Sequence, residues 1–305
     1  IHVSNSTFTN QTYYGIYAYR MNRSKLINNT FYRSGTTSWY GAYLNDCDSA
    51  LNIVGNTFYS PYYGSGLYLY GCNATLSEHS LVANNFIAIQ DSSNTSYDAL
   101  RLSSCTYTDV LFNNVSNNSS YLSAYAMYLS YSSNYRLLNN NFICGNGGVS
   151  IYLYSNTSTT ELDYNNYFTT GSVVGFFNGT SYSDLSTWKV ATGKDTASIS
   201  ADPNYTGGGD LHVSSSAIDS SGTPDVAVLT DIDGEIRNLT HPDIGADEVL
   251  YFPDDLAVTR IAAPLSGCGL TSDSITVRIK NFGSDPQTGF DINVLYNGNT
   301  ITQNV

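Results

Sequence analysis

NNTF at residues 28–31 returns as GNTF at 55–58, ANNF at 83–86 and NNNF at 139–142, and this recurring phrase decides the fold. Successive steps between its Asn residues are 27, 28, 29, 27 and 26 residues. A near-constant period of this length, with no helical periodicity inside it, predicts a solenoid. The six occurrences are Asn29/Phe31, Asn56/Phe58, Asn84/Phe86, Asn113/Val115, Asn140/Phe142 and Asn166/Phe168.

A second phrase lies half a period away and predicts a strand in every repeat. In it, apolar residues alternate with an aromatic or polar residue, which is the period of a strand with one buried face. The phrase reads GIYAYRM (15–21), GAYLNDC (41–47), GLYLYGC (66–72), ALRLSSC (99–105), AMYLSYS (126–132) and SIYLYSN (150–156). Its outward position is occupied by Tyr17, Tyr43, Tyr68, Arg101, Tyr128 and Tyr152.

A further short strand precedes each repeated Asn. Several short strands and polar turns in one repeat predict a coil of a parallel β-helix, with neighbouring coils about 4.8 Å apart. The repeated Asn suits a turn, and stacked Asn side chains can bond from coil to coil. The predicted apolar columns are Leu26, Ile53, Leu81, Val110 and Leu137, each followed by Ile27, Val54, Val82, Leu111 or Leu138.

These phrases resemble those of right-handed parallel β-helix proteins of the pectate-lyase-like superfamily. The resemblance covers about residues 1–180. It implies an all-β solenoid but no single function, because that superfamily holds lyases, hydrolases, phage tailspikes and non-enzymatic adhesins. We expect β-helix repeats over 1–182, acidic closing coils that cap the solenoid over 183–254, and the start of an immunoglobulin-like module over 255–305.

Composition supports an all-β protein that does not bind nucleic acid. Charged residues make up 12% of the chain, Tyr occurs 27 times, and the net charge is −13. A nucleic-acid-binding surface would need a basic stripe. Residues 183–255 carry 3 basic and 14 acidic side chains. Their sequence resembles the closing coils of secreted bacterial β-helix proteins, and a solenoid end does need a cover over its apolar cross-section.

The last fifty residues alternate like strands, as in Ile275–Ile279 and Phe290–Val294. They resemble the start of a CARDB-type immunoglobulin-like module. The combination resembles large cell-surface proteins of Bacteroidota, many of them exported by the type IX secretion system. This implies an extracellular location on a bacterial surface, contact with secretion machinery, and membrane attachment only through domains outside this chain. Because residue 1 already lies inside a repeat, we expect a longer protein.

Three cysteines share one column of the repeat: Cys47, Cys72 and Cys105. We expect a ladder of small buried side chains, because parallel stacking does not make the Cβ vectors converge as a disulfide requires. Neither CxxC nor paired His accompanies them, so zinc is not expected there. Cys268 is a candidate for pairing with a cysteine beyond this chain.

One stretch of the acidic segment suggests a Ca²⁺ loop. Asp231, Asp233 and Glu235 surround Gly234 and offer oxygen ligands of the kind that Ca²⁺ prefers. Asp225, Asp243 and Asp247 are further candidates. The alternative is that these Asp residues cap turns and that Arg237 pairs with one of them.

Catalytic candidates are few. The acidic residues of 1–182 fall in different columns of the repeat, and we expect none to stack beside another. Asp98 and Arg101 are the best pair, although strand alternation places them on opposite faces. His79 is expected to be a hydrogen-bonded structural histidine.

The tyrosine column is the main binding candidate. Tyr17, Tyr43, Tyr68, Arg101, Tyr128 and Tyr152 would form an outward stripe, with Arg101 stacked on its neighbours and Tyr14, Trp39, Tyr40 and Tyr125 beside it. Wet aromatic faces suit sugar rings, but a tyrosine ladder can also serve only to stabilise the stack. Our leading hypothesis is a non-enzymatic adhesin or stalk that binds carbohydrate or a surface. The alternatives are a polysaccharide lyase or hydrolase, and a passive spacer.

Overall fold

A computed structural model describes residues 1–90, 97–155, 158–249, 256–264, 274–281, 286–296 and 298–305. The chain divides into two compact units, Ile1–Val249 and Leu250–Val305. Among the described residues, no helix has the length and apolar character needed to cross a membrane.

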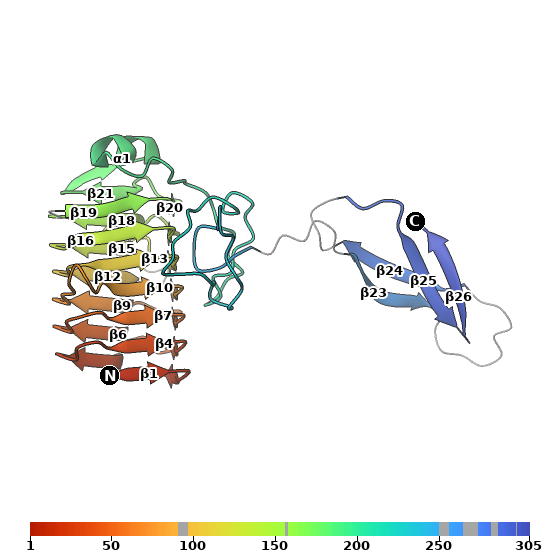
Figure 1. The fold of residues 1–305 in the computed structure, drawn as a ribbon, viewed down its shortest axis with the longest axis horizontal. Helices are drawn as coiled ribbons and strands as arrows, with labels where there is room; N and C mark the ends of the chain where they lie inside the picture. Colours follow the sequence, from red (N-terminus) through yellow and green to blue (C-terminus); the bar gives the residue numbers. More distant parts are fainter. Residues whose placement is uncertain (91–96, 156–157, 250–255, 265–273, 282–285, 297) are drawn as a thin grey trace. The chain divides into compact units, whose positions relative to one another are not determined.

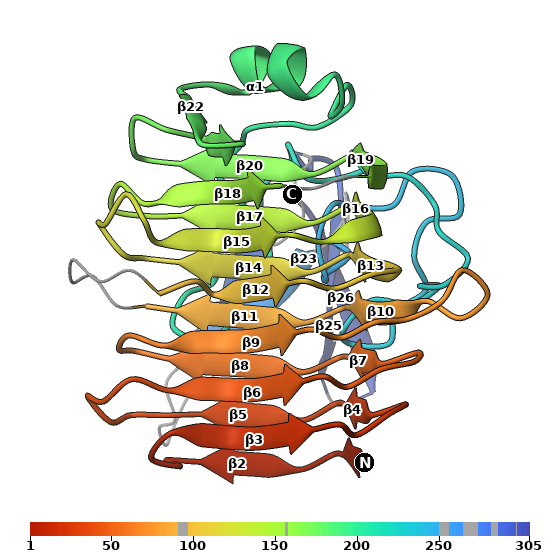
Figure 2. The same ribbon diagram turned by 90° about the vertical axis from the view of Figure 1, so that its left-hand side faces the viewer.

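The first unit is a stack of coils, and each coil contributes one strand to each of three sheets (Figures 1 and 2). Sheet A is parallel and contains β1 (His2–Ser4), β4 (Lys25–Ile27), β7 (Asn52–Val54), β10 (Ser80–Ala83), β13 (Thr108–Leu111), β16 (Ser133–Leu138) and β19 (Ser158–Asp163). Sheet B is parallel and contains β2 (Thr7–Thr9), β5 (Thr30–Tyr32), β8 (Thr57–Ser60), β11 (Phe86–Ile89), β14 (Asn114–Asn117), β17 (Asn141–Cys144) and β20 (Asn166–Thr169).

Sheet C carries the second sequence phrase. Its parallel strands are β3 (Tyr14–Tyr19), β6 (Tyr40–Asn45), β9 (Ser65–Tyr70), β12 (Leu100–Ser103), β15 (Tyr125–Ser130), β18 (Val149–Tyr154) and β21 (Gly175–Phe177), and β22 (Thr180–Tyr182) pairs antiparallel with β21. The solenoid predicted from the sequence is therefore confirmed, with the inward-facing apolar residues of all three sheets buried in one continuous core.

A ladder of buried Asn side chains runs the length of the stack. Each Asn donates from Nδ2 to Oδ1 of the Asn in the next coil, at 2.9–3.0 Å. The same Oδ1 also accepts the backbone N–H of the preceding ladder Asn, so buried polar groups are satisfied coil by coil. The ladder consists of Asn29, Asn56, Asn85, Asn113, Asn140 and Asn165.

Two of the six predicted phrases were assigned one residue out of register. The third ladder residue is Asn85, not Asn84, so Ile87 rather than Phe86 pairs with Phe58. The column before it shifts likewise, and Val82 rather than Leu81 pairs with Ile53. In the sixth coil, Asn165 and Tyr167 replace Asn166 and Phe168. Adjacent Asn residues made the choice ambiguous in both coils.

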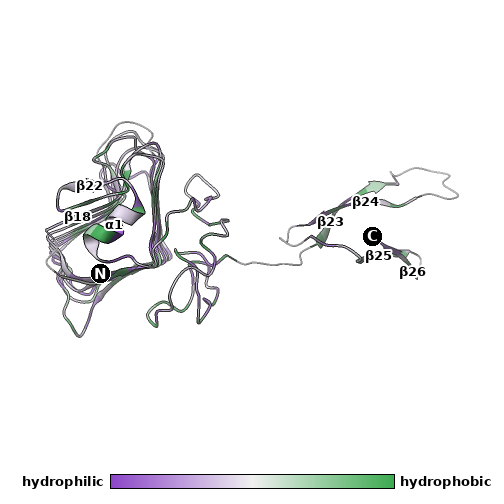
Figure 3. Cartoon of the chain, turned by 90° about the horizontal axis from the view of Figure 1, so that it is seen from above, coloured by the Kyte–Doolittle hydropathy of each residue, from purple (hydrophilic) through white to green (hydrophobic). Residues whose placement is uncertain are grey.

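Helix α1 (Leu185–Thr192) lies across the end of the stack (Figure 3). It begins at the N-cap Asp184, whose side chain accepts the Thr187 N–H, and ends at Gly193 in the left-handed region, at φ 62°. Trp188 is fully buried against Gly175, where a Cβ would come within 2.7 Å of the indole ring. This helix covers the apolar cross-section that the sequence predicted would need a cap.

The rest of the acidic segment does not continue over the end. Residues 200–249, here called the flank segment, run beside the stack as an irregular chain (Figures 1 and 3). Leu211 and Ala246 cover Phe86 and Ala88 on the outer face of β11, while Ile87 and Ile89 of that strand point into the core. Both faces of β11 are therefore buried, which is why alternation could not fix its register.

The neighbours of the ladder Asn residues attach the flank segment. Asn114 Nδ2 donates to the Leu211 carbonyl at 2.8 Å, and Asn141 Nδ2 donates to the Ile244 carbonyl at 2.9 Å. Similar bonds join Asn84 to Thr230, Asn139 to Thr223 and Asn166 to Ala201. Where two Asn residues are adjacent, the ladder Asn therefore bonds to the next coil inside the stack, and its neighbour bonds to the flank segment outside it.

Within its described residues, the second unit contains two antiparallel strand pairs. β23 (Leu256–Ala263) pairs with β24 (Thr276–Asn281), and β25 (Asp291–Tyr296) pairs with β26 (Asn299–Asn304). The sequence predicted strands at Ile275–Ile279 and Phe290–Val294, and β24 and β25 cover most of these two stretches. Membership of the CARDB type, and the domain limits at 182/183 and 254/255, stay predictions. Cys268 lies outside the described residues.

Candidate functional site

The predicted tyrosine column forms one continuous row on the outer side of sheet C. Strand register joins all six predicted side chains in order, from Tyr17 through Tyr43, Tyr68, Arg101 and Tyr128 to Tyr152. Phe176 extends the row by one coil beyond the prediction. Inward neighbours such as Leu67 and Leu69 are fully buried, so the row faces away from the core.

The rings of this row stack on one another along the solenoid axis. Tyr43 and Tyr68 have ring centroids 4.6 Å apart at an interplanar angle of 4°, and Tyr128 and Tyr152 are 4.8 Å apart at 6°. Arg101 fills the gap with Cζ 5.0 Å from the Tyr68 centroid and 4.2 Å from the Tyr128 centroid. The predicted stacking of Arg101 is confirmed, and its guanidinium continues the ladder as a cation.

This stacking changes the surface that the row presents. Ring faces were expected to remain wet, but most of them cover each other, so ring edges and hydroxyl groups point outward. The two ends of the row are exceptions, since Tyr17 is tilted 59° from Tyr43 and Phe176 is tilted 48° from Tyr152. Tyr17 is also 51% exposed. Burial raises the pKa of Tyr43 to about 12, so its hydroxyl is neutral at pH 7 and can both donate and accept.

A second, shorter row lies beside the first. Tyr14 stacks on Tyr40 at 5.6 Å, Tyr40 approaches Tyr68 at 6.1 Å, and Tyr125 approaches Tyr152 at 4.8 Å. Trp39 does not belong to this surface. It is fully buried in the turn before β6, where its backbone packs against Gly64.

Asp98 and Arg101 form an ion pair, with Nη1 3.1 Å from Oδ2. The expectation that they lie on opposite faces was wrong, because Asp98 precedes β12 and strand alternation does not extend to it. Burial raises the pKa of Asp98 to about 7, although Arg101 acts in the opposite direction. Arg101 is thereby oriented along the tyrosine row.

Two acidic residues share one column of sheet A, although the sequence placed all of them in different columns. Arg136 lies between these two, so they do not stack directly on each other, as expected. Asp109, Arg136 and Glu161 occupy one column, and Arg136 contacts Asp109 at 3.4 Å and Glu161 at 2.7 Å. Asp225 of the flank segment makes a third contact with Arg136. His79 Nδ1 lies 3.0 Å from Asp109 Oδ1, as expected of a hydrogen-bonded structural histidine. The cluster therefore links the flank segment to the solenoid.

The acidic residues of the predicted Ca²⁺ loop do not point to one common site. Asp231 accepts hydrogen bonds from the backbone N–H groups of Asp233, Glu235 and Glu248, so its carboxylate holds the turn. Glu235 is half-buried on that turn, and its carboxylate does not join the cluster that Asp233 forms with His212 and Asp247.

The other acidic candidates of the segment also hold the chain in place. Asp243 accepts from the backbone N–H groups of Ser220 and Val249. Arg237 pairs at 3.0 Å with Glu248, and not with one of the aspartates as the sequence suggested.

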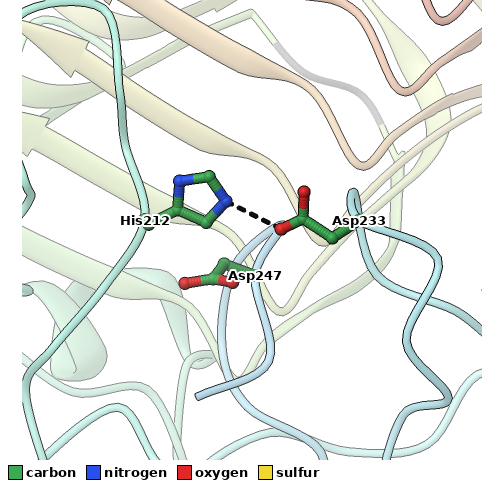
Figure 4. A group of neighbouring side chains, drawn as sticks. All are labelled: His212, Asp233 and Asp247. Atoms are coloured by element: carbon green, nitrogen blue, oxygen red, sulfur yellow. Dashed lines mark hydrogen bonds and ion pairs between the residues drawn. The ribbon is translucent and has the colours of Figure 1, made fainter. Parts of the chain in front are cut away.

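Asp233 instead meets two residues that come from other passes of the flank segment. Ligand atoms of His212, Asp233 and Asp247 all lie within 4.8 Å of one another (Figure 4). His212 Nε2 is 2.7 Å from Asp233 Oδ2, and Nδ1 contacts Asp210. Burial alone would lower the pKa of His212, but the bonds to Asp210 and Asp233 raise it to about 9.

Sequence reasoning missed His212. It lies far along the chain from Asp233, and the repeat frame that organises residues 1–182 does not reach it. The sequence Asp210-Leu211-His212 gave a weak indication. Side chains two residues apart on an extended chain point to the same side, so a carboxylate there can lie next to the imidazole.

Comparison with known proteins gives a family for the solenoid. No curated protein and no solved structure matches this chain. Residues 1–187 match the family described as a right-handed β-helix region, which agrees with the three parallel sheets of the first unit. The chain therefore belongs to the right-handed β-helix family.

Proposed function

We propose that the outer side of sheet C binds carbohydrate and that the protein acts as a non-enzymatic adhesin or stalk. The observation that carries this proposal is the unbroken row from Tyr17 to Phe176, in which every ring but one contacts its neighbour in the next coil and Arg101 bridges the gap. Such a row is long and straight, and it suits an extended chain better than a compact ligand.

The chemistry of the row favours a sugar polymer. Phenol groups that remain neutral offer a donor and an acceptor at each step, as sugar hydroxyls require, and ring edges offer apolar contact to C–H groups. Steps between rings are set by the strand spacing of about 4.8 Å. Arg101 supplies a single cation that can pair with a carboxylate or sulfate on the polymer.

The setting of the protein is proposed from sequence resemblance. We propose an extracellular location on a bacterial surface of the Bacteroidota type, export by secretion machinery, and an immunoglobulin-like module of the CARDB type after the solenoid. The acidic charge of residues 183–255 supports a partner other than nucleic acid.

A glycan array with a matched pair of variants tests the binding face. In the first variant Tyr43, Tyr68 and Tyr128 are replaced by Ser. In the control Tyr62, Tyr121 and Tyr131 are replaced by Ser; these are exposed tyrosines outside the row. With about 1 kcal/mol lost per hydroxyl contact, the first variant should bind about a hundredfold more weakly, and the control should bind like the unchanged protein.

Two outcomes would contradict the proposal. Equal binding by both variants would make the tyrosine row purely structural. Shortened polysaccharide chains after incubation would favour a lyase or hydrolase instead. Circular dichroism of each variant shows whether the fold is retained.

A further inference from the structure

We propose that His212, Asp233 and Asp247 bind a first-row transition-metal dication, with Zn²⁺ as the probe. This site is independent of the tyrosine row, since it is built by the flank segment against the outer side of sheet B. It also differs from the Ca²⁺ loop expected from the sequence, because Asp231 is occupied by backbone N–H groups and an imidazole takes part.

The spacing of the three side chains fits a dication. Their ligand atoms lie within 4.8 Å of one another (Figure 4). Zinc bonds of 2.0–2.2 Å place two ligand atoms about 3.3 Å apart, so small rotations of the side chains bring all three into range. Asp233 stands on a turn that contains Gly234 at φ 89°, and its side chain is half exposed, so it is free to make this adjustment.

His212 is already oriented as a metal ligand. Asp210 contacts Nδ1, which leaves Nε2 directed toward Asp233. A carboxylate behind the imidazole fixes the tautomer and ring orientation in the same way around many protein-bound metals. The edge-to-face contact of the ring with Phe86, at 4.9 Å, further limits its rotation.

The donor set discriminates between metals. One imidazole nitrogen with two carboxylates suits zinc and its first-row neighbours, whereas Ca²⁺ and Mg²⁺ prefer oxygen ligands alone. Asp247 accepts the Val213 N–H at Oδ2, at 2.8 Å, which holds its carboxylate in place beside His212 and Asp233. Three carboxylates surround the imidazole, those of Asp210, Asp233 and Asp247. Their negative charge is balanced better by a dication than by the single positive charge of a protonated imidazole.

A bound metal would hold three separate passes of the flank segment together. His212 lies on the first pass, Asp233 on the turn that follows, and Asp247 on the return. Leu211 and Ala246, each adjacent to a ligand, pack on Phe86 and Ala88 of β11. The metal would therefore fasten an irregular segment to the solenoid where regular backbone pairing is absent.

The test is Zn²⁺ binding by the full chain after treatment with EDTA, measured by isothermal titration calorimetry. We expect one Zn²⁺ per chain, a loss of affinity of more than about 100-fold in His212→Ala, and a loss of about 10–100-fold in Asp210→Asn. The control His241→Ala removes an exposed histidine of the same segment and should bind Zn²⁺ normally. Zn²⁺ should raise the thermal unfolding midpoint of the unchanged protein but not that of His212→Ala.

Asp233→Asn keeps the test decisive if His212→Ala unfolds. Asp233 is exposed, so this variant should fold normally. Its affinity for Zn²⁺ should nevertheless be lower than that of the unchanged protein by more than about tenfold. The proposal is overturned if the His212 and Asp233 variants bind Zn²⁺ as the unchanged protein does. It is also overturned if Ca²⁺ binds more tightly than Zn²⁺, or if no Zn²⁺ binds.

Discussion

At the scale of single residues, the Asn ladder has the greatest influence on this protein. Asn113 accepts at Oδ1 from the Asn85 side chain and backbone, and donates from Nδ2 to Asn140 and to the carbonyls of Val82 and Leu111. All of these groups are buried, so water could not take the place of the Asn113 side chain if it were removed. One side chain thus satisfies the polar groups of three successive coils.

We predict that Asn113→Ala lowers the free energy of unfolding by about 2–5 kcal/mol, because it leaves several buried donors and acceptors without partners. Urea denaturation followed by circular dichroism measures this change. Asn22→Ala is the matched control, since Asn22 is exposed and accepts one exposed bond, from the Asp48 N–H, and the change should cost less than about 1 kcal/mol. Equal losses in the two variants would show that the ladder is not a source of stability.

Residue patterns predicted the register of sheet C correctly and that of the Asn phrase only in part. Every residue of the tyrosine column was placed correctly, because Gly or another small residue marks the start of each strand and only one face is apolar. Asn84 and Asn85 look alike in the sequence, and Phe86 is as apolar as Ile87. The difference between them depends on the flank segment, whose position no local pattern reveals.

At the scale of elements, helix α1 closes the solenoid through one side chain. Trp188 contacts Tyr167, Phe177 and Tyr182, and its Nε1 donates to Asp195 at 2.7 Å. A helix of 8 residues is too short to be stable alone in water, so α1 depends on these tertiary contacts. Removing the Trp188 side chain should therefore open the apolar end of the stack.

Trp188→Ala is predicted to destabilise the first unit by about 3–5 kcal/mol, as is usual when a buried Trp is truncated. Val190→Ala lies on the same helix and is the control, since Val190 is 86% exposed and should change stability by less than about 0.5 kcal/mol. Thermal unfolding monitored by circular dichroism compares them. A Trp188→Ala protein as stable as the control would mean that the end needs no cap.

The residues of the candidate metal site could be predicted from the sequence only in part. Asp233 and Asp247 were named from the sequence as possible metal ligands, because acidic residues near Gly suggest a cation loop. His212 could not be paired with them, since the flank segment has no repeat or alternation that would indicate which of its passes meet. The distribution of roles between Asp231 and Asp233 likewise depends on backbone N–H groups, which a sequence pattern does not place.

At the scale of the whole molecule, buried carboxyl groups make stability depend on pH. Burial raises the pKa of Asp98 and Asp243 to about 7 and that of Asp195 and Asp247 to about 6. A carboxyl group whose pKa is higher in the folded chain stabilises the fold below its unfolded pKa. That contribution is lost as the pH rises through the folded pKa. For these groups the loss occurs between about pH 4 and pH 7.

We therefore predict that the first unit unfolds at a higher temperature at pH 5 than at pH 8. The pKa of Asp195, about 6, lies one unit above pH 5, so this group alone gives a difference of the order of 1 kcal/mol between these conditions. Asp184 and Asp210 have lowered pKa values, and both remain ionised across this range. Asp98→Asn should reduce the pH dependence, and the control Asp48→Asn, at a half-exposed position, should not. A midpoint that rises toward pH 8 would contradict the prediction.

The flank segment also determines how many repeats the solenoid can have. Its bonds reach four successive coils, at Asn84, Asn114, Asn141 and Asn166. A duplicate of residues 29–55 inserted after Gly55 would lengthen the stack ahead of this region and should be tolerated. A duplicate of residues 113–139 inserted after Asn139 has the same length of 27 residues but would separate the attachment points by an extra coil. Repeat number is thus variable in the first coils and fixed in the later ones, so growth of this protein by repeat duplication is confined to one end.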